Sequence, residues 1–174
     1  MVGSDNTPPG LNPKKAAYMA SDLEKNAKYW GLPIKMPEEF FKLMSSNANL
    51  KAQRFLVALE HENPDYLRPA ARELWYRMWS RDEPIHEIQN IKEVCDKLKI
   101  PNSDKLISEI NSPKVKDLLK KNTEEALAYE AFGAPWIVLK REGEEDACFF
   151  GGDRFPILCN ELGIEFQGPL KSKI

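Results

Sequence analysis

Two short stretches near the carboxyl end have residue types and spacing that suit ligand binding. In "AFGAPWIVLK", Pro135 stands at the first position of an apolar run that predicts a β-strand. Proline has no backbone N–H to donate, so within sheets it is confined to edges, bulges and strand starts. The Ala134–Pro135 bond could be trans and simply end the preceding helix, or it could be cis, which we predict. A cis bond would leave the backbone of Ala134 available to pair with an extended peptide.

The second stretch, "GGDR", lies between another apolar run and a helical pattern. Gly152 allows a close approach of the backbone, and the amides at the start of a helix attract an anion. Asp153 either caps that helix or binds an ammonium group. A site for peptide backbone, together with a site for a carboxylate beside an ammonium, matches the groups of glutathione, a thiol peptide.

The remaining polar residues suggest neither a catalytic group nor a metal site. Neither of the two histidines has a second metal ligand nearby in the sequence, and the three cysteines form no C-x-x-C motif. Both observations argue against a zinc site, and the second argues against disulfide exchange. These histidines and cysteines are His61, His86, Cys95, Cys148 and Cys159. The serines are interpreted as helix caps or solvated residues: Ser4, Ser45, Ser46, Ser103 and Ser112. Four large side chains either belong to the core or border an apolar co-substrate pocket: Tyr18, Met19, Trp75 and Trp79.

The elements that must hold these stretches are mostly helical. Apolar spacing of three and four residues, with caps and terminating glycines, predicts helices at about 13–30, 36–46, 49–62, 64–80, 88–98, 106–110, 112–132 and 153–162. The helix at 49–62 is apolar on most sides and is expected in the middle of a bundle. Asn12, Asn49 and Asp153 are the expected N-caps. Two β-rich runs at 136–140 and 147–151, joined by "REGEED", predict an antiparallel hairpin.

The predicted sheet looks half present. A two-stranded hairpin is marginal alone, and the run 136–139 is apolar on both faces, as in a central strand. No earlier segment predicts a strand, so we expect a partner strand to be missing. The 174 residues suit one domain or one domain with an insert, and a net charge of −2 argues against a nucleic-acid partner. No apolar run is long enough for membrane insertion.

The chain resembles the kappa-class glutathione transferases. The segments that carry the resemblance are "PPGLNPKKAAYMASDL", "RELWYRMWSRDE", "SPKVKDLLKKNTEEA", "AFGAPW" and "FFGGDRFPIL". The resemblance implies a helix-rich α/β protein with a thioredoxin-like fold interrupted by a helical domain. It divides the chain into a leading loop of the glutathione site at 1–13, a helical domain at 14–130 and the C-terminal part of the thioredoxin-like domain at 131–174.

The resemblance also implies a set of glutathione-contacting positions. Asn6 stands at the family's asparagine, and Lys15 can meet the glycyl carboxylate. The backbone of Ala134, where the family usually has leucine, pairs with the cysteinyl unit. Gly152 replaces a serine, so one hydroxyl contact to the γ-glutamyl end is lost, whereas Asp153 matches the family. The expected glutathione-binding residues are therefore Asn6, Lys15, Ala134, Pro135, Gly152 and Asp153.

By resemblance, the protein is a glutathione transferase that conjugates the thiolate of glutathione to electrophilic small molecules in detoxification. It would be a homodimer of mitochondria or peroxisomes, and the tail Ser172, Lys173 and Ile174 is similar to a peroxisomal signal. A glutathione-dependent isomerase shares the architecture. The family's catalytic serine and its N-terminal strand-helix-strand unit are expected to be absent, so an alternative is a truncated, catalytically impaired glutathione-binding or interaction protein.

Overall fold

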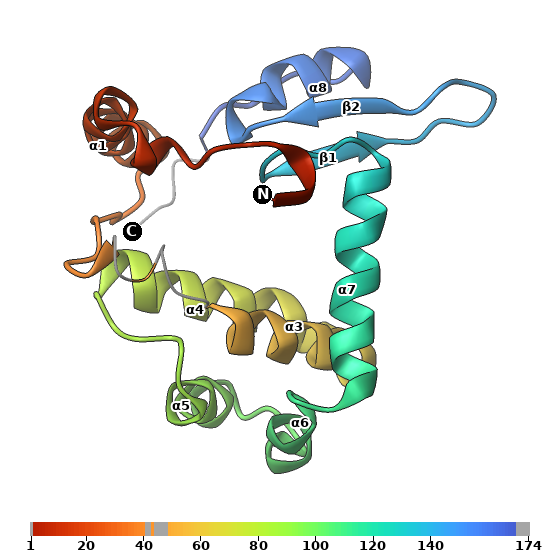
Figure 1. The fold of residues 1–174 in the computed structure, drawn as a ribbon. Helices are drawn as coiled ribbons and strands as arrows, with labels where there is room; N and C mark the ends of the chain where they lie inside the picture. Colours follow the sequence, from red (N-terminus) through yellow and green to blue (C-terminus); the bar gives the residue numbers. More distant parts are fainter. Residues whose placement is uncertain (1, 41–42, 44–48, 170–174) are drawn as a thin grey trace. The chain divides into compact units, whose positions relative to one another are not determined.

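Helices dominate the computed structural model, which describes residues 2–40, 43 and 49–169 (Figure 1). The α-helices are α1 (Pro13–Trp30), α3 (Leu50–Glu62), α4 (Leu67–Ser80), α5 (Ile88–Leu98), α6 (Ser103–Glu109), α7 (Pro113–Ala128) and α8 (Phe155–Glu161). The strands are β1 (Trp136–Leu139) and β2 (Ala147–Phe150). Short 3-10 turns are η1 (Val2–Ser4), η2 (Pro9–Leu11), η3 (Pro64–Tyr66) and η4 (Gly152–Arg154). Most of the helix predicted at 36–46, with Ser45 and Ser46, and the tail from Ser172 to Ile174 lie outside the described residues.

Capping residues explain where several of these helices begin and end. The Asn12 side chain accepts hydrogen bonds from the amides of Lys14 and Lys15 at 3.1 and 3.2 Å, which confirms it as the N-cap of α1. Gly31 ends α1 in the left-handed region, with φ of 65°. Ser112 similarly accepts from the amide of Val115. Asn49 occupies the predicted N-cap position of α3, but its side chain makes no capping hydrogen bond.

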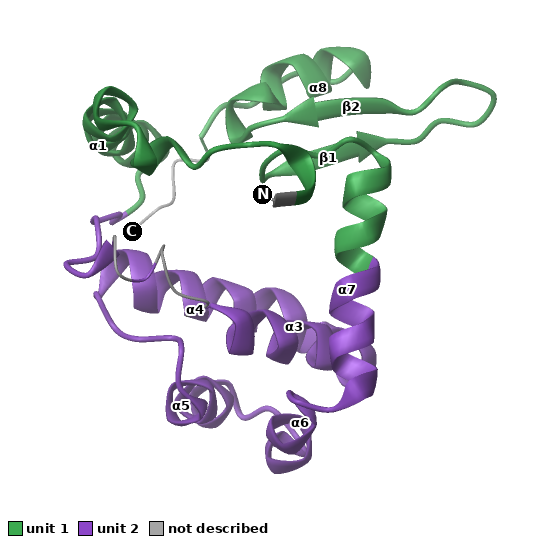
Figure 2. Ribbon diagram, viewed as in Figure 1, with its two compact units in different colours: residues 1–32, 122–174 green, residues 33–121 purple. Residues whose placement is uncertain are grey.

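Contacts divide the chain into two compact units, shown in Figure 2. We call residues 33–121 the helical unit and residues 1–32 with 122–174 the hairpin unit. This grouping reports compactness, not family domains, so the boundaries expected at residues 14 and 131 stay a prediction.

The helical unit has a conventional hydrophobic core centred on α3. This helix contacts α4, α5 and α6, which confirms its predicted place in the middle of a bundle. The side chains of Phe55 and Leu59 on α3 are completely buried, as are those of Ile91 on α5 and Ile110 after α6. Burying such side chains contributes about 1.5–3 kcal/mol each, so the core can stabilise this unit.

A buried ion-pair network ties α4 to the chain that follows it. The Glu73 carboxylate, 9% exposed, accepts from Arg81 at 2.6 Å and from Lys97 at 2.7 Å. Arg81 also donates to Glu83 at 2.9 Å. This hydrogen bond from Arg81 lowers the pKa of the Glu83 carboxyl, and partial burial opposes the shift only in part. The network satisfies charged groups that would otherwise be costly to bury.

The hairpin unit contains the predicted antiparallel pair. Strands β1 and β2 are paired with Trp136 opposite Phe150 and Leu139 opposite Ala147, and they form the two-stranded sheet of the described chain. Phe132 packs against both Trp136 and Phe150, with ring centroids 5.1 and 4.7 Å away. A Cβ at Gly133 would lie only 2.7 Å from the Phe150 ring, so this packing requires glycine there.

None of the helices in the described residues has the length and apolar character needed to cross a lipid bilayer.

Candidate functional site

The segment before β1 presents an unpaired stretch of backbone. The Ala134–Pro135 bond is cis, as predicted, and both residues are exposed. The Pro135 carbonyl accepts from the amide of Gly151 at 3.0 Å, which joins the segment to the end of β2. Within the described residues, the N–H and C=O of Ala134 take part in no backbone hydrogen bond. These groups can therefore pair with a ligand.

Asn6 is fixed to this same segment. Its side-chain amide donates a hydrogen bond of 2.5 Å to the carbonyl oxygen of Phe132, across 126 positions of sequence. Phe132 is two residues before Ala134, so the leading loop and the segment before β1 lie together. Two of the predicted site positions are thus brought into one neighbourhood.

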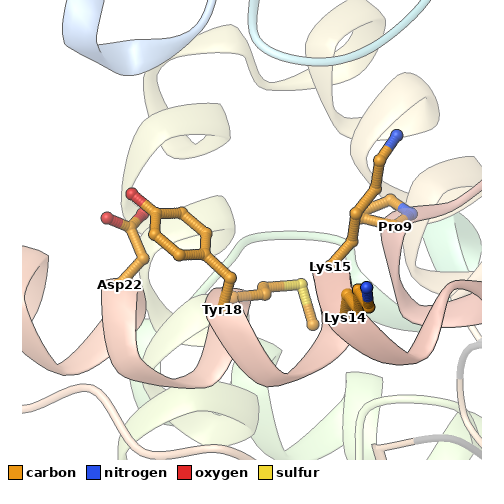
Figure 3. A pocket seen from close by; sticks show the side chains of 6 residues that line it. Pro9, Lys14, Lys15, Tyr18 and Asp22 are labelled. Carbon is orange, nitrogen blue, oxygen red and sulfur yellow. The ribbon is translucent and has the colours of Figure 1, made fainter.

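Lys15 lies on a different element, helix α1. Because positions 15, 18 and 22 are three and four residues apart on α1, their side chains rise from the same side of the helix, as Figure 3 shows. They border a cavity of about 420 Å³, which we call the Lys15 cavity. Its lining residues are Pro9, Lys14, Lys15, Tyr18, Met19 and Asp22.

A larger cavity of about 760 Å³ adjoins the first, and we call it the α1–α8 cavity. It is lined by Tyr18, Asp22, Asn26, Trp30, Leu32, Gly152, Asp153, Phe155 and Phe166. Tyr18 and Asp22 line both cavities, so the two are neighbours along α1. The predicted residues Gly152 and Asp153 are therefore brought close to the helix that carries Lys15, whereas Ala134 and Pro135 line neither cavity.

The turn that presents Asp153 depends on Gly151, which no sequence pattern marked. Gly151 has φ of 102°, and a Cβ there would lie 2.5 Å from Oδ1 of Asp153. Gly152, which we predicted to allow the close approach, has nothing within 4 Å of an added Cβ. The predicted close approach of a ligand to Gly152 stays a prediction, and within the chain the glycine that the turn requires is Gly151.

Asp153 is not used to cap the last helix. It lies inside η4, and the N-cap position of α8 is Arg154, without a side-chain capping bond. The capping alternative for Asp153 was therefore wrong. Its carboxylate lies 3.2 Å from the Arg154 guanidinium, and both side chains are largely exposed. The carboxylate thus remains accessible to a ligand.

The two cavities differ in the charged residues that line them. Lys14 and Lys15 line the Lys15 cavity, Asp153 lines the α1–α8 cavity, and Asp22 lines both. This arrangement suits an elongated ligand with a carboxylate at one end and an ammonium at the other.

Comparisons with known proteins show the family of this chain. The family described as DSBA-like thioredoxin domain matches residues 1–163. Human glutathione S-transferase kappa 1 is 41% identical over 172 residues, which cover 98% of this chain and 76% of the human protein. The chain belongs to the kappa class of glutathione transferases. Glutathione S-transferase kappa 2 of Caenorhabditis elegans is 34% identical over 95% of the chain and 75% of its own length. Rat glutathione S-transferase kappa 1 is 34% identical over 98% of this chain and 76% of its own length.

Membership of the kappa class confirms the predicted family, the thioredoxin-like, helix-rich fold and the predicted transferase class. The assignment of individual residues to glutathione stays a prediction for this kappa-class chain, because it rests on the resemblance and on geometry. Among the residues that the structure describes, no group of three or more His, Cys, Asp or Glu side chains is arranged to hold a metal ion.

Several cavity residues were missed or left undecided from sequence. Tyr18 was weighed between core and pocket, and it is 67% exposed on both cavities. Asp22 was not singled out, although its position four residues after Tyr18 places it on the same face of α1. Phe166 follows the last helix in a segment without periodic structure, so no sequence pattern marked it.

Proposed function

We propose that this chain binds glutathione along α1 and conjugates its thiolate to electrophilic small molecules. The glycyl carboxylate would lie toward Lys15 and the γ-glutamyl end at Asp153. The observation that carries the proposal is the pair of adjoining cavities, of which one is lined by lysines and the other by an accessible carboxylate. The name of the human relative, a glutathione S-transferase, supports the same ligand.

The middle of the tripeptide would be held by backbone. The exposed N–H and C=O of Ala134 can pair with the cysteinyl unit as one strand residue pairs with another. Asn6 would act on the same segment, because its hydrogen bond to Phe132 holds the chain that leads into Ala134. These contacts would fix the position of the sulfur.

In the reaction, the glutathione thiol loses its proton to solvent and the resulting thiolate attacks an electrophilic carbon. A new C–S bond forms, and a leaving group departs with the electron pair of its broken bond. Hydrogen bonds and positive charge near a thiol lower its pKa and favour the thiolate. Since glutathione is itself the nucleophile, the task of the protein is mainly positioning.

The family resemblance also supports a proposal about the oligomeric state, the biological process and the organelle. The chain would act as a homodimer in detoxification, in mitochondria or peroxisomes. Size-exclusion chromatography with light scattering tests the first point, and a monomer at micromolar concentration would contradict it.

Calorimetric titration with glutathione tests the proposed orientation. We expect Asp153→Asn to weaken binding about tenfold or more, because a charge-assisted hydrogen bond to the ammonium is lost. Lys15→Ala should weaken it by a similar factor. Asp117→Asn on α7 and Lys25→Ala on α1 are matched controls, because they make the same charge changes at exposed positions outside both cavities. Equal affinities for site and control variants would contradict the proposed orientation.

Conjugation is measured separately, by the absorbance of the product formed from glutathione and chlorodinitrobenzene. Turnover that depends on Asp153 and Lys15 would support the transferase. Glutathione binding without turnover would support the alternative considered from sequence, a glutathione-binding protein impaired in catalysis.

A further inference from the structure

The segment 132–135, between α7 and β1 (Figure 1), is held by hydrogen bonds on both sides of Ala134. On one side, the Asn6 side chain donates to the Phe132 carbonyl. On the other, the amide of Gly151 donates to the carbonyl of residue 135. Ala134 lies between these two points, and the proposed function assigns its N–H and C=O to the cysteinyl unit of glutathione. The place of these two groups therefore depends on what holds Gly133.

The ring of Phe150, the last residue of β2, lies against the backbone of Gly133. A Cβ added at Gly133 would be 2.7 Å from Cε2 and 3.2 Å from Cζ of this ring, whereas carbon atoms in contact are normally about 3.5–4.0 Å apart. The ring therefore occupies the space that a side chain at position 133 would need. Phe150 is thus in direct contact with the residue that precedes Ala134.

The same ring also contacts the residues that flank Gly133, Ala134 and Pro135. Its centroid is 4.7 Å from that of Phe132 and 6.3 Å from that of Trp136. Because Trp136 is opposite Phe150 in the register of the hairpin, the two rings lie on the same face of the sheet. Aromatic pairs of this kind favour particular mutual orientations. One side chain of β2 thereby fixes both ends of the short segment that contains Ala134.

Phe150 is not a core residue. Its side chain is 42% exposed, and so is that of Phe132. Truncating such a ring removes much less buried surface than truncating a completely buried one, so its contribution to the free energy of unfolding is limited. The contacts of this ring with the segment before β1 therefore bear more on the local position of the backbone than on stability.

We propose that Phe150 is a positioning residue of the glutathione site: its ring, packed against Gly133, holds the N–H and C=O of Ala134 where they pair with the cysteinyl unit. The inference rests on the proposed function, because it assumes that pairing. Phe150 acts through the backbone and does not have to touch glutathione. A backbone hydrogen bond of about 2.9 Å is lost when one partner moves by about 1 Å, so a small displacement of Ala134 is sufficient to weaken binding.

A ligand that lacks one backbone donor tests this role. In the depsipeptide analogue of glutathione, an ester oxygen replaces the cysteinyl N–H, so the ligand cannot donate to the Ala134 carbonyl, whereas its charged ends are unchanged. Calorimetry on the full chain compares the affinities of glutathione and this analogue. We expect the parent chain to prefer glutathione about tenfold, the factor that corresponds to one lost hydrogen bond.

Variants of β2 separate positioning from stability. Phe150→Ala should reduce the preference to about twofold or less, because the Ala134 carbonyl is no longer held in line with the ligand. Phe150→Tyr keeps the ring, and the new hydroxyl can reach solvent from this partly exposed position, so the preference should remain. Phe149→Ala is the control, because it removes the same ring at the neighbouring position of β2, on the opposite face of the hairpin. Both alanine variants should lower the midpoint of thermal unfolding, but only Phe150→Ala should lower the preference.

Gly133→Ala approaches the same contact from the other side. The added Cβ must displace either the Phe150 ring or the segment itself, so the preference should fall as in Phe150→Ala. In the double variant the ring is already absent, and Gly133→Ala should lower the preference no further. Such non-additivity is expected of residues in direct contact, and it provides a second measurement should Phe150→Ala fold poorly.

The outcomes separate this inference from the proposed function. If the parent chain prefers glutathione and Phe150→Ala keeps that preference, the inference is wrong and the proposed function stands. A preference that is lost in Phe149→Ala as well would also contradict the inference, because general loosening of the hairpin would explain it. Equal binding of both ligands by the parent chain would contradict the pairing at Ala134 and the inference with it, and no binding of either would contradict the proposed function. Loss in Phe150→Ala and Gly133→Ala, with retention in Phe150→Tyr and Phe149→Ala, would establish the inference.

Discussion

The helical unit buries most of its large apolar side chains, whereas the hairpin unit exposes many of them. All of the residues in the buried hydrophobic cluster, from Ala52 to Val115, belong to the helical unit. In the hairpin unit, α1 and α8 contain no fully buried residue. Of the exposed large apolar side chains among the described residues, only Trp75 lies in the helical unit; the others are Leu11, Tyr18, Tyr29, Leu32, Leu127, Phe132, Phe150, Phe155, Ile157, Leu162 and Ile164.

This difference assigns stability mainly to the helical unit and ligand binding to the hairpin unit. The helical unit has a core that can sustain its own fold, whereas the hairpin unit presents aromatic and aliphatic surface together with every predicted site residue. Contiguous exposed apolar surface is typical of places where a ligand or another chain binds. We therefore expect changes in the helical unit to affect unfolding and changes in the hairpin unit to affect binding, and four predictions test this division.

The largest expected effect comes from truncating the core. Phe55→Ala should lower the free energy of unfolding by about 3–5 kcal/mol, because a completely buried ring leaves a cavity. Its counterpart in the hairpin unit is Phe155→Ala, where the side chain is 43% exposed and the expected loss is about 1 kcal/mol or less. Urea unfolding followed by circular dichroism measures both. Equal losses would show that the two units share one stabilising core.

The buried ion-pair network should give the next largest effect. Glu73→Gln removes the charge that both Arg81 and Lys97 contact, and we expect a loss of about 2 kcal/mol in the free energy of unfolding. The loss is moderate because both cations are partly exposed and can be solvated. Glu62→Gln, which breaks an exposed pair with Lys105, is the control and should leave stability unchanged. A control loss as large as that of Glu73→Gln would argue against any special role of burial.

A smaller effect on stability, with a specific effect on binding, is expected at the turn of the hairpin unit. Gly151→Ala forces a side chain into a positive φ and against the Asp153 carboxylate. We expect a loss of about 1–2 kcal/mol in the free energy of unfolding and weaker glutathione binding, because Asp153 must move. Gly152→Ala meets no neighbour and should change stability little. Thermal unfolding and calorimetry on the two variants make the comparison, and identical behaviour would contradict the role assigned to Gly151.

The smallest effect is a pH dependence in the helical unit. The hydrogen bond from Arg81 holds the pKa of Glu83 below its ordinary value of 4.5. The group therefore contributes stability above about pH 4.5, and this contribution is lost as the pH falls through the lower, folded-state pKa. Glu83→Gln should flatten the fall in stability between about pH 5 and about pH 3, whereas glutathione binding at neutral pH should not change. Parallel pH profiles for the variant and the parent chain would contradict the assignment.

Sequence patterns predicted the helical unit better than the site. Helical spacing and caps such as Asn12 depend on neighbours within one turn, so they can be derived from short stretches. The cavities depend on pairs such as Trp30 with Phe166, which no local pattern connects. The Gly-Gly pair was recognised as significant, but only the backbone angles show that Gly151 is the member that must be glycine. The family resemblance supplied the site residues that local patterns did not predict. The distances between these residues could be determined only from the structure.

The hydrogen bond from Asn6 to Phe132 has a consequence for biosynthesis. It closes a loop of 126 positions, and contacts of such long range are slow to form because the chain must first lose much of its freedom. During translation, the core from Ala52 to Val115 can assemble while the last strands are still inside the ribosome, since domains fold as their segments emerge. The hydrogen bond of the leading loop cannot form before Phe132 has emerged, and the α1–α8 cavity cannot form before Asp153 has emerged. We therefore expect nascent chains to acquire stable helices well before they can retain glutathione.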